Sequence, residues 1–141
     1  MSIRYNIFPS LDLLLYVFEG DCAAKQYFDL YHEIHKQDAR RHYGMKVLMD
    51  LSHGSIELEN NSLSVAKQII VNNRTDGRPR DRVAMLSTSS SLSKLKEAFV
   101  LIADDLPLEL EVFHNIKDTI DWLGLSDHER QVLEIFKDAH S

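Results

Sequence analysis

The stretch that decides the fold is VLMDLSHGSIELENN, residues 47–61, in which an apolar run meets an abrupt polar break. The apolar residues within 45–51 (MKVLMDL) predict a short buried strand. Asp-Leu-Ser-His-Gly is expected to end this strand, and a helix is expected to follow from about residue 58. Because α/β sheets place ligand and partner sites where strands end, the polar residues of this break are candidates for function.

Strands and helices alternate outward from this stretch. Four more strands are predicted at 4–8, 11–19, 82–87 and 108–113. Helices are predicted from Asp21 to about 37, from 58 onward, over 92–102, from Asn115 to Gly124, and after Ser126. The order β-β-α-β-α-β-α-β-α plus a C-terminal helix predicts an α/β fold, in which a mixed β-sheet carries helices packed on it.

Local signals refine this plan. Residues 11–19 are apolar on both faces, which predicts a central strand covered on both sides. Glu109 and Glu111 alternate with apolar residues, which is typical of an edge strand with one wet face. Helix starts are predicted at three sites, and Gly124 is expected to end a helix. These N-terminal signals are Asp21, Asn115, and the capping-box pair Ser126 and Glu129.

Length and composition indicate one soluble domain. The 141 residues carry a net charge of −6, so nucleic acid and anionic lipid are not expected as partners. No apolar run has the length of a membrane span or a signal peptide, so a cytoplasmic protein is expected. Cys22 is the only cysteine, which excludes an internal disulfide and a cysteine-based metal cluster, and it is interpreted as a small packing residue.

Four segments resemble one known family. They are YVFEGD (16–21), LMDLS (48–52), RVAML (82–86) and EVFHNIKDTIDWLGL (111–125). They are similar to small bacterial SpoIIAA-like proteins, which are relatives of the STAS domain and are sometimes grouped with lipid-carrying SEC14-type domains. The resemblance implies one SpoIIAA/STAS-like domain over residues 1–125, with 126–141 as its C-terminal helical extension.

The resemblance also implies a function. STAS-type antagonists of anti-sigma factors bind a protein partner and are switched by phosphorylation of a serine after the third strand. Asp50-Leu51-Ser52 matches the start of that pattern, whereas Glu59 and Asn60 stand near the position of the phosphoserine. We therefore expect a non-enzymatic regulatory or protein-interaction module with an unidentified protein partner. Its candidate contact residues are Asp50, Ser52, His53, Ser55 and Ser62.

A serine-rich tract forms a second candidate site. The residues Ser89, Ser90, Ser91 and Lys94 stand at the expected start of a helix, where free amides and a positive dipole can bind an anion. The simpler interpretation is that one of these serines caps the helix.

Two other functions stay open. A carrier of a small apolar ligand or lipid is indicated by the SEC14 likeness and by the aromatic residues Tyr27, Phe28, Tyr31 and Phe99. An enzyme using Asp50, His53 and a serine is the weaker alternative, because the chain has no Gly-x-Ser-x-Gly motif.

Metal and cofactor binding are not expected. His32 and His35 lie three residues apart on a predicted helix, and no third ligand is evident. A homodimer is expected instead, because Val132, Leu133 and Phe136 of the terminal helix need a cover.

Overall fold

The computed structural model describes residues 2–41, 44–57, 81–87 and 108–140. Its strands are β1 (Ser2–Phe8), β2 (Leu13–Ala23), β3 (Lys46–Glu57), β4 (Asp81–Leu86) and β5 (Leu108–Phe113). Its helices are α1 (Ala24–Gln37), α4 (Ile116–Trp122) and α5 (Glu129–Ala139), with 3-10 turns at Pro9–Leu11 and Ser126–His128. The predicted helices from 58 onward and over 92–102 lie outside the described residues.

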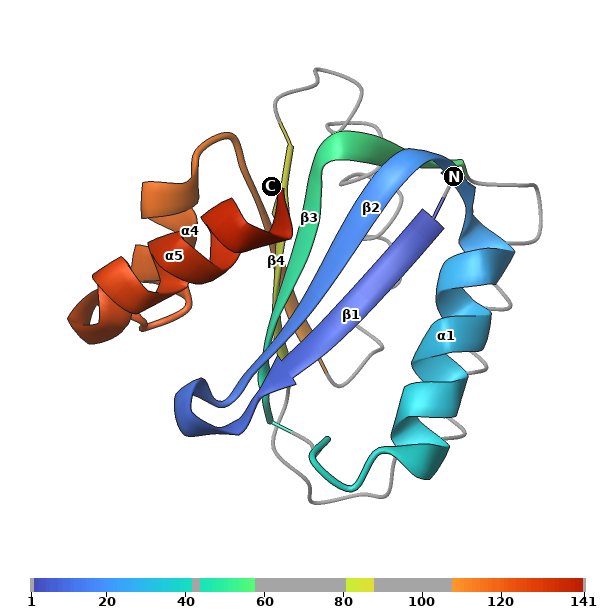
Figure 1. Cartoon of the computed structure of the whole chain (residues 1–141), viewed down its shortest axis with the longest axis horizontal. Coiled ribbons are helices and arrows are strands. Elements are labelled where there is room, and N and C mark those ends of the chain that lie inside the picture. Colours follow the sequence, from blue (N-terminus) through green and yellow to red (C-terminus); the bar gives the residue numbers. More distant parts are fainter. Residues whose placement is uncertain (1, 42–43, 58–80, 88–107, 141) are drawn as a thin grey trace.

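The five strands form one mixed sheet in the order β1-β2-β3-β4-β5. β1 is antiparallel to β2, and the other neighbours are parallel. Figure 1 looks onto β1, with α1 on one face of the sheet and α4 and α5 on the other. This arrangement confirms the predicted α/β fold with a mixed sheet and helices packed on it.

β2 explains why the sheet needs a layer on each face. Its residues Leu14, Tyr16 and Phe18 are buried in a cluster with α1. The alternate residues Leu13, Leu15 and Val17 are buried in a second cluster with α4 and α5. The period-2 alternation of a strand sends successive side chains to opposite faces, so the prediction of a doubly covered strand is confirmed.

Two predicted strand ends are wrong. β2 continues through Gly20 to Ala23, and β3 continues through the polar break to Glu57. These extensions pair with each other from Glu19–His53 to Ala23–Glu57, so the backbone hydrogen bonds of the ladder maintain both strands where apolar residues run out. Asp21 consequently does not cap α1, and its carboxylate accepts a hydrogen bond from Ser55 Oγ at 2.7 Å.

The capping signals near the C-terminus have different outcomes. Asn115 caps α4 as predicted, because its side chain accepts a hydrogen bond from the Asp118 amide at 2.8 Å. Gly124 follows the helix with a φ of 74°, the left-handed conformation that ends helices. The capping box is wrong: Ser126 lies in a 3-10 turn and donates its hydroxyl to Asp121 at 2.7 Å.

The sheet ends at β5 on one side, as its alternating glutamates predicted, and Glu109 is exposed. On the opposite face from α1, α5 packs onto the same core as α4, with Val132 only 2% exposed. Among the described helices, none has the length and apolar character that crossing a bilayer requires.

Candidate functional site

Asp50 lies in the middle of β3, level with the ends of the neighbouring parallel strands β4 and β5. It stands beside Val17 of β2 and Leu86 of β4, and Leu86 stands beside Phe113 of β5. The carboxylate is fully buried, at 0% exposure, on the sheet face that carries α4 and α5. A buried charge is costly unless it is paired and hydrogen-bonded, so the surroundings of Asp50 must supply donors.

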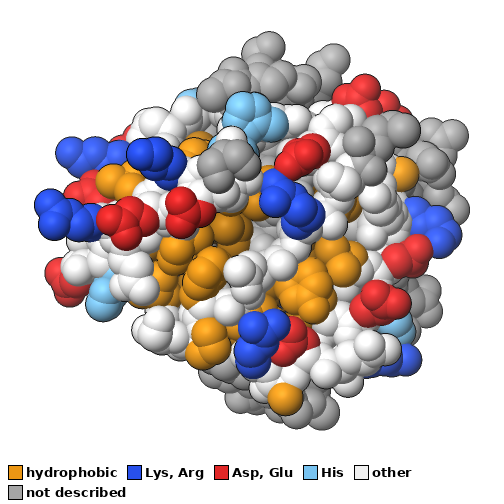
Figure 2. Space-filling model, in the orientation of Figure 1, with side chains coloured by type: hydrophobic (Ala, Val, Ile, Leu, Met, Phe, Trp, Pro, Cys, Tyr) orange, Lys and Arg blue, Asp and Glu red, His pale blue; other side chains and the backbone are white. Residues whose placement is uncertain are grey.

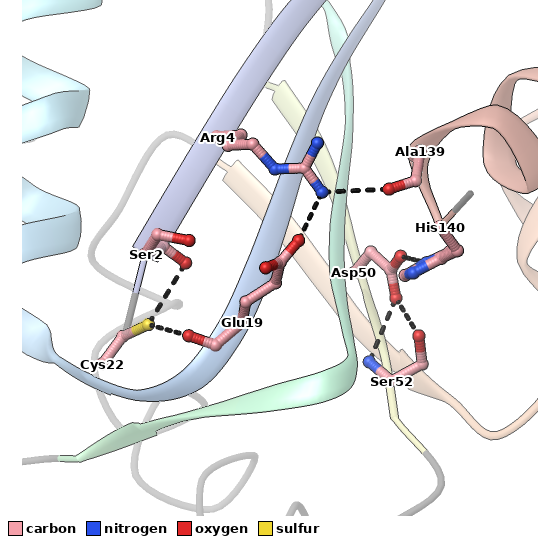
Figure 3. A network of polar contacts seen from close by, with 8 residues as sticks. All are labelled: Ser2, Arg4, Glu19, Cys22, Asp50, Ser52, Ala139 and His140. Atoms are coloured by element: carbon pink, nitrogen blue, oxygen red, sulfur yellow. Dashed lines mark hydrogen bonds and ion pairs between the residues drawn. The ribbon is translucent and has the colours of Figure 1, made fainter.

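Two residues supply these donors. Oδ1 of Asp50 accepts hydrogen bonds from the Ser52 amide at 3.0 Å and from the Ser52 hydroxyl at 2.6 Å. Oδ2 accepts from Nε2 of His140, which comes from the end of α5 (Figure 3). Both carboxylate oxygens are therefore bonded within the chain.

His140 is also held by ring contacts. Its ring centroid lies 4.3 Å from that of His53 and 4.7 Å from that of Phe136, and the planes of the His140 and Phe136 rings meet at 63°. Because Nε2 donates to Asp50, a neutral His140 carries its proton on Nε2 and presents Nδ1 as an acceptor. The His140 side chain is 16% exposed, so it forms the boundary between the core and the surface.

An open groove of about 580 Å³ lies against these imidazoles. Its lining consists of Ser2, Arg4, Glu19, His53, Ala139 and His140. The Arg4 guanidinium donates to Glu19 Oε1 at 2.5 Å and to the Ala139 carbonyl at 2.9 Å, which fixes β1 to the end of α5 (Figure 3). The groove thus has a largely polar lining, in which Arg4 is paired with Glu19.

The structure brings together only part of the predicted contact site. Asp50, Ser52 and His53 are close, and His53 is exposed. Ser55 lies further along β3, where it bonds to Asp21. The remaining predicted residues lie outside the described residues: Ser62 of the contact site, and Ser89, Ser90, Ser91 and Lys94 of the anion site.

His140 was missing from the prediction. An aspartate inside the apolar run VLMDL signals that a partner is needed, but the partner comes from the other end of the chain. The usable signal is the segment DAH at 138–140, which places an imidazole one helical turn beyond Phe136.

His114 and Ser87 occupy the same sheet edge, as expected for residues that follow β4 and β5. Nδ1 of His114 lies 3.0 Å from the carbonyl oxygen of Ser87, and Ser87 donates its amide to the Phe113 carbonyl. These contacts join the ends of β4 and β5.

The aromatic residues of α1, Cys22 and His35 make contacts within the fold. Tyr27, Phe28 and Tyr31 are buried in the core rather than lining a described cavity. Cys22 is buried, and its thiol donates to the Ser2 carbonyl at 3.5 Å, while burial raises the pKa of the thiol. Nδ1 of His35 lies 2.9 Å from the Tyr31 carbonyl. Among the described residues, no three His, Cys, Asp or Glu side chains are grouped to hold a metal ion.

The apolar residues of α5 that suggested a dimer are mostly covered within the chain. Val132 and Phe136, two of the three residues expected to need a cover, pack against the core of their own chain. Leu133 alone of the three is exposed, at 40%. The apolar side of α5 therefore gives little reason to expect a second copy, and the oligomeric state stays a prediction.

The chain was compared with known proteins, and a solved structure is similar in fold. No family model matches the sequence, and no curated protein does. A solved structure of an uncharacterised DUF3478-family protein from Shewanella loihica PV-4, described as having a SpoIIAA-like fold, is similar with a TM-score of 0.55. The similarity covers 86% of this chain and 94% of the other at 19% sequence identity, a level that speaks to the fold alone. The chain therefore has the SpoIIAA-like fold that the segments 16–21, 48–52, 82–86 and 111–125 predicted.

Proposed function

We propose that the chain is a non-enzymatic protein-interaction module of STAS type. Its contact surface is the outer part of β3, residues 52–57, together with His140. The observation that carries the proposal is the bonding of Asp50, whose two carboxylate oxygens are engaged by Ser52 and His140. Asp50, Ser52 and His140 carry groups typical of catalysis, but here they bond to one another and fix the position of the contact surface.

The geometry argues against a nucleophilic enzyme. A general base must reach the hydroxyl that it deprotonates at about 2.6–3.2 Å. Among the described residues, His53 forms no hydrogen bond to a hydroxyl, and the Ser52 hydroxyl donates to Asp50 instead. The serine is therefore bonded to a buried carboxylate rather than to an imidazole.

The proposed surface has groups that a protein partner can recognise. His53 and Glu57 are exposed, and Ser52, Gly54 and Ser55 are half-buried. His53 rests on His140, which is anchored to the core through Asp50. A preorganised surface loses little conformational entropy on binding, which favours affinity.

The experiment compares proteins that co-purify from the native host with wild type, His53→Ala and His128→Ala. His128 is an exposed histidine in the turn before α5 and is the matched control. We expect a partner that is retained by wild type and the control and depleted about tenfold or more with His53→Ala, a loss of about 1.4 kcal/mol. Titration calorimetry with the purified partner must reproduce this order.

Two results would contradict the proposal. One is an identical set of co-purifying proteins for all three variants. The other is hydrolysis of ester or phosphate substrates that wild type catalyses and His140→Ala does not.

A second candidate function, a carrier of a small apolar ligand, is favoured by a separate groove. This groove of about 370 Å³ lies between α5 and the β1-β2 hairpin, and its lining includes the apolar residues Phe8, Leu15, Val17, Ile135 and Ala139. The volume is within the range of small-molecule sites. Native mass spectrometry after exposure to fatty acids and phospholipids should then detect a bound species, and only bare protein would count against a carrier.

A further inference from the structure

The outer edge of β1 is open. β1 is the end strand of the sheet, and among the described residues no strand pairs with its outer side. Arg4, Tyr5 and Asn6 in its middle are exposed, with Tyr5 at 38%. An end strand presents unpaired backbone N–H and C=O groups, which act as a template for another strand.

Hollows flank this edge on both faces of the sheet. On the α5 side lies the groove of about 370 Å³, with Phe8, Leu15, Val17 and Ile135 in its lining. On the α1 side lies a hollow of about 280 Å³, lined by Tyr5, Leu30, Glu33, Ile34, Gln37 and Asp38. Figure 2 shows hydrophobic side chains on both sides of β1, toward α5 and toward α1.

The two hollows match the geometry of a strand. Successive side chains of an added strand would point alternately into the α5-side groove and the α1-side hollow. In known strand additions, main-chain hydrogen bonds give affinity, and pockets for alternate side chains give specificity. The surface around β1 has both of these elements.

The charge on β1 does not shield the edge. Edge strands are commonly protected by charged side chains that discourage pairing. The only charged residue of β1 is Arg4, and its guanidinium is bonded to Glu19 and to the Ala139 carbonyl on the α5 side (Figure 3). The arginine is therefore held across the sheet face and away from the open backbone.

The two hollows differ in chemistry. The α5-side groove has five apolar side chains in its lining, those of Phe8, Leu15, Val17, Ile135 and Ala139, and its other lining residues are Arg4, Tyr5, Asn6 and Asp138. The α1-side hollow has two carboxylates, of which Asp38 is paired with Arg40 at 2.9 Å, while Glu33 is exposed and bonds no cation among the described residues. The apolar groove selects an apolar side chain, and Glu33 selects a basic one.

We propose that the open edge of β1 binds an extended peptide segment in which apolar and basic residues alternate. The apolar residues enter the groove beside Ile135, and the basic residues face Glu33. This binding goes beyond the proposed contact surface at His53, because it uses the backbone of β1 and hollows that His53 does not line.

A second copy of the chain fits this edge less well. An antiparallel pair of β1 strands keeps each face on its own side, so Arg4 and Asn6 of the copy would lie by the apolar groove. Ile3 and Ile7 of the copy would lie by Glu33. Both faces would then be mismatched, which favours a peptide of the opposite pattern.

The test uses a labelled peptide of seven residues, in which leucine and lysine alternate and whose length equals that of β1. Its binding is measured by fluorescence anisotropy. A peptide of the same sequence with N-methylated amides along one edge keeps the side chains and loses the main-chain donors. We expect the methylated peptide to bind about tenfold or more weakly. Equal binding of the two peptides would show charge attraction alone and would overturn the proposal.

Variants locate the binding. Glu33→Gln and Ile135→Ala should each lower the affinity for the peptide several-fold. Glu134→Gln changes an exposed residue of α5 and should leave the affinity unchanged. Glu33 is exposed, so its variant is expected to fold even if Ile135→Ala does not. The proposal would be overturned if the peptide did not bind. It would also be overturned if sedimentation equilibrium showed that the chain self-associates through β1 instead.

Discussion

Asp50 and His140 are hydrogen-bonded although 90 residues of sequence separate them. The bond joins the middle of β3 to the residue that directly follows α5, and Arg4 adds a second link by donating to the Ala139 carbonyl. The end of the terminal helix is thus fixed to the sheet at the edge that carries the proposed contact surface.

Removing His140 should destabilise the fold. In His140→Ala, the buried Asp50 carboxylate keeps its two hydrogen bonds from Ser52 and loses the one from the His140 imidazole. We expect the free energy of unfolding to fall by about 2 kcal/mol, since a hydrogen bond to a buried charge contributes more than a neutral one. Urea unfolding measures the change.

The control for this prediction is His128→Ala, which removes an exposed histidine and should change stability by less than about 0.5 kcal/mol. In a double-mutant cycle, Asp50→Ala with His140→Ala should be less destabilising than the sum of the single changes. Strict additivity would show that the two side chains do not interact.

The sequence predicted Asp50 as part of a site, but it did not predict what Asp50 does. Its position at the end of an apolar run was readable because strands have period-2 patterns and sheet edges carry sites. Its partner was not readable, because no local pattern connects residue 50 to residue 140. Long-range pairs of this kind arise from how helices dock on the sheet.

The length of β3 was mispredicted for a related reason. Ser52, His53 and Gly54 resemble a loop by composition, but His53 and Gly54 pair with Glu19 and Gly20 in the extension of β2. Gly54 stands opposite Gly20, where the two strands run past an irregularity near Phe18. Pairing between distant strands determined this segment, and local propensity did not.

Gly54→Ala should therefore be strongly destabilising. A Cβ at this position would lie 2.6 Å from the Phe18 carbonyl oxygen and 2.9 Å from that of Gly20, so the backbone of β2 must move. We expect a loss of about 2 kcal/mol or more in thermal or urea unfolding.

Gly124→Ala is the comparison for Gly54→Ala. Nothing lies within 4 Å of a Cβ there, and only the φ of 74° is unfavourable, so a loss of about 1 kcal/mol is expected. If the two variants lost the same stability, the close contact with Phe18 would have no energetic role.

Of the two predicted helix caps Asn115 and Ser126, only Asn115 caps a helix in the structure. Mutating each residue should therefore change stability by different amounts. Asn115→Ala removes an acceptor for the Asp118 amide at the start of α4 and should lower stability by about 1 kcal/mol. Ser126→Ala removes only an exposed hydrogen bond to Asp121 and should change it by less than about 0.5 kcal/mol. Chemical unfolding of both variants checks the order, and a reversed order would restore Ser126 as the cap.

The grooves beside β1 could not be predicted from sequence patterns. The apolar faces of β2 and α5 were readable, but patterns do not tell how far a helix stands from the edge of a sheet. Phe8 and Ile135 lie 127 residues apart, and only the docking of α5 leaves a hollow between them. The aromatic residues that suggested a carrier are part of the core, because Tyr27 and Phe28 pack in one cluster with Tyr16 and Phe18.

These buried tyrosines predict a loss of stability at alkaline pH. Burial raises the pKa of the Tyr16 and Tyr27 hydroxyls above the ordinary value of 10.0, and their rings are 5.2 Å apart. Above about pH 10 the unfolded chain releases these protons while the folded chain keeps them, so the unfolded state binds fewer protons. Stability must then fall as pH rises, by up to about 1.4 kcal/mol per pH unit for each tyrosine.

Urea unfolding between about pH 9 and pH 11 tests this dependence. Tyr27→Phe should make the fall with pH less steep, because it removes one of the two raised groups and leaves the ring in the core. Tyr5→Phe, at a side chain that is 38% exposed, is the matched control and should keep the wild-type slope. A Tyr27→Phe slope equal to that of wild type would mean that the Tyr27 hydroxyl ionises as readily in the folded chain as in the unfolded one.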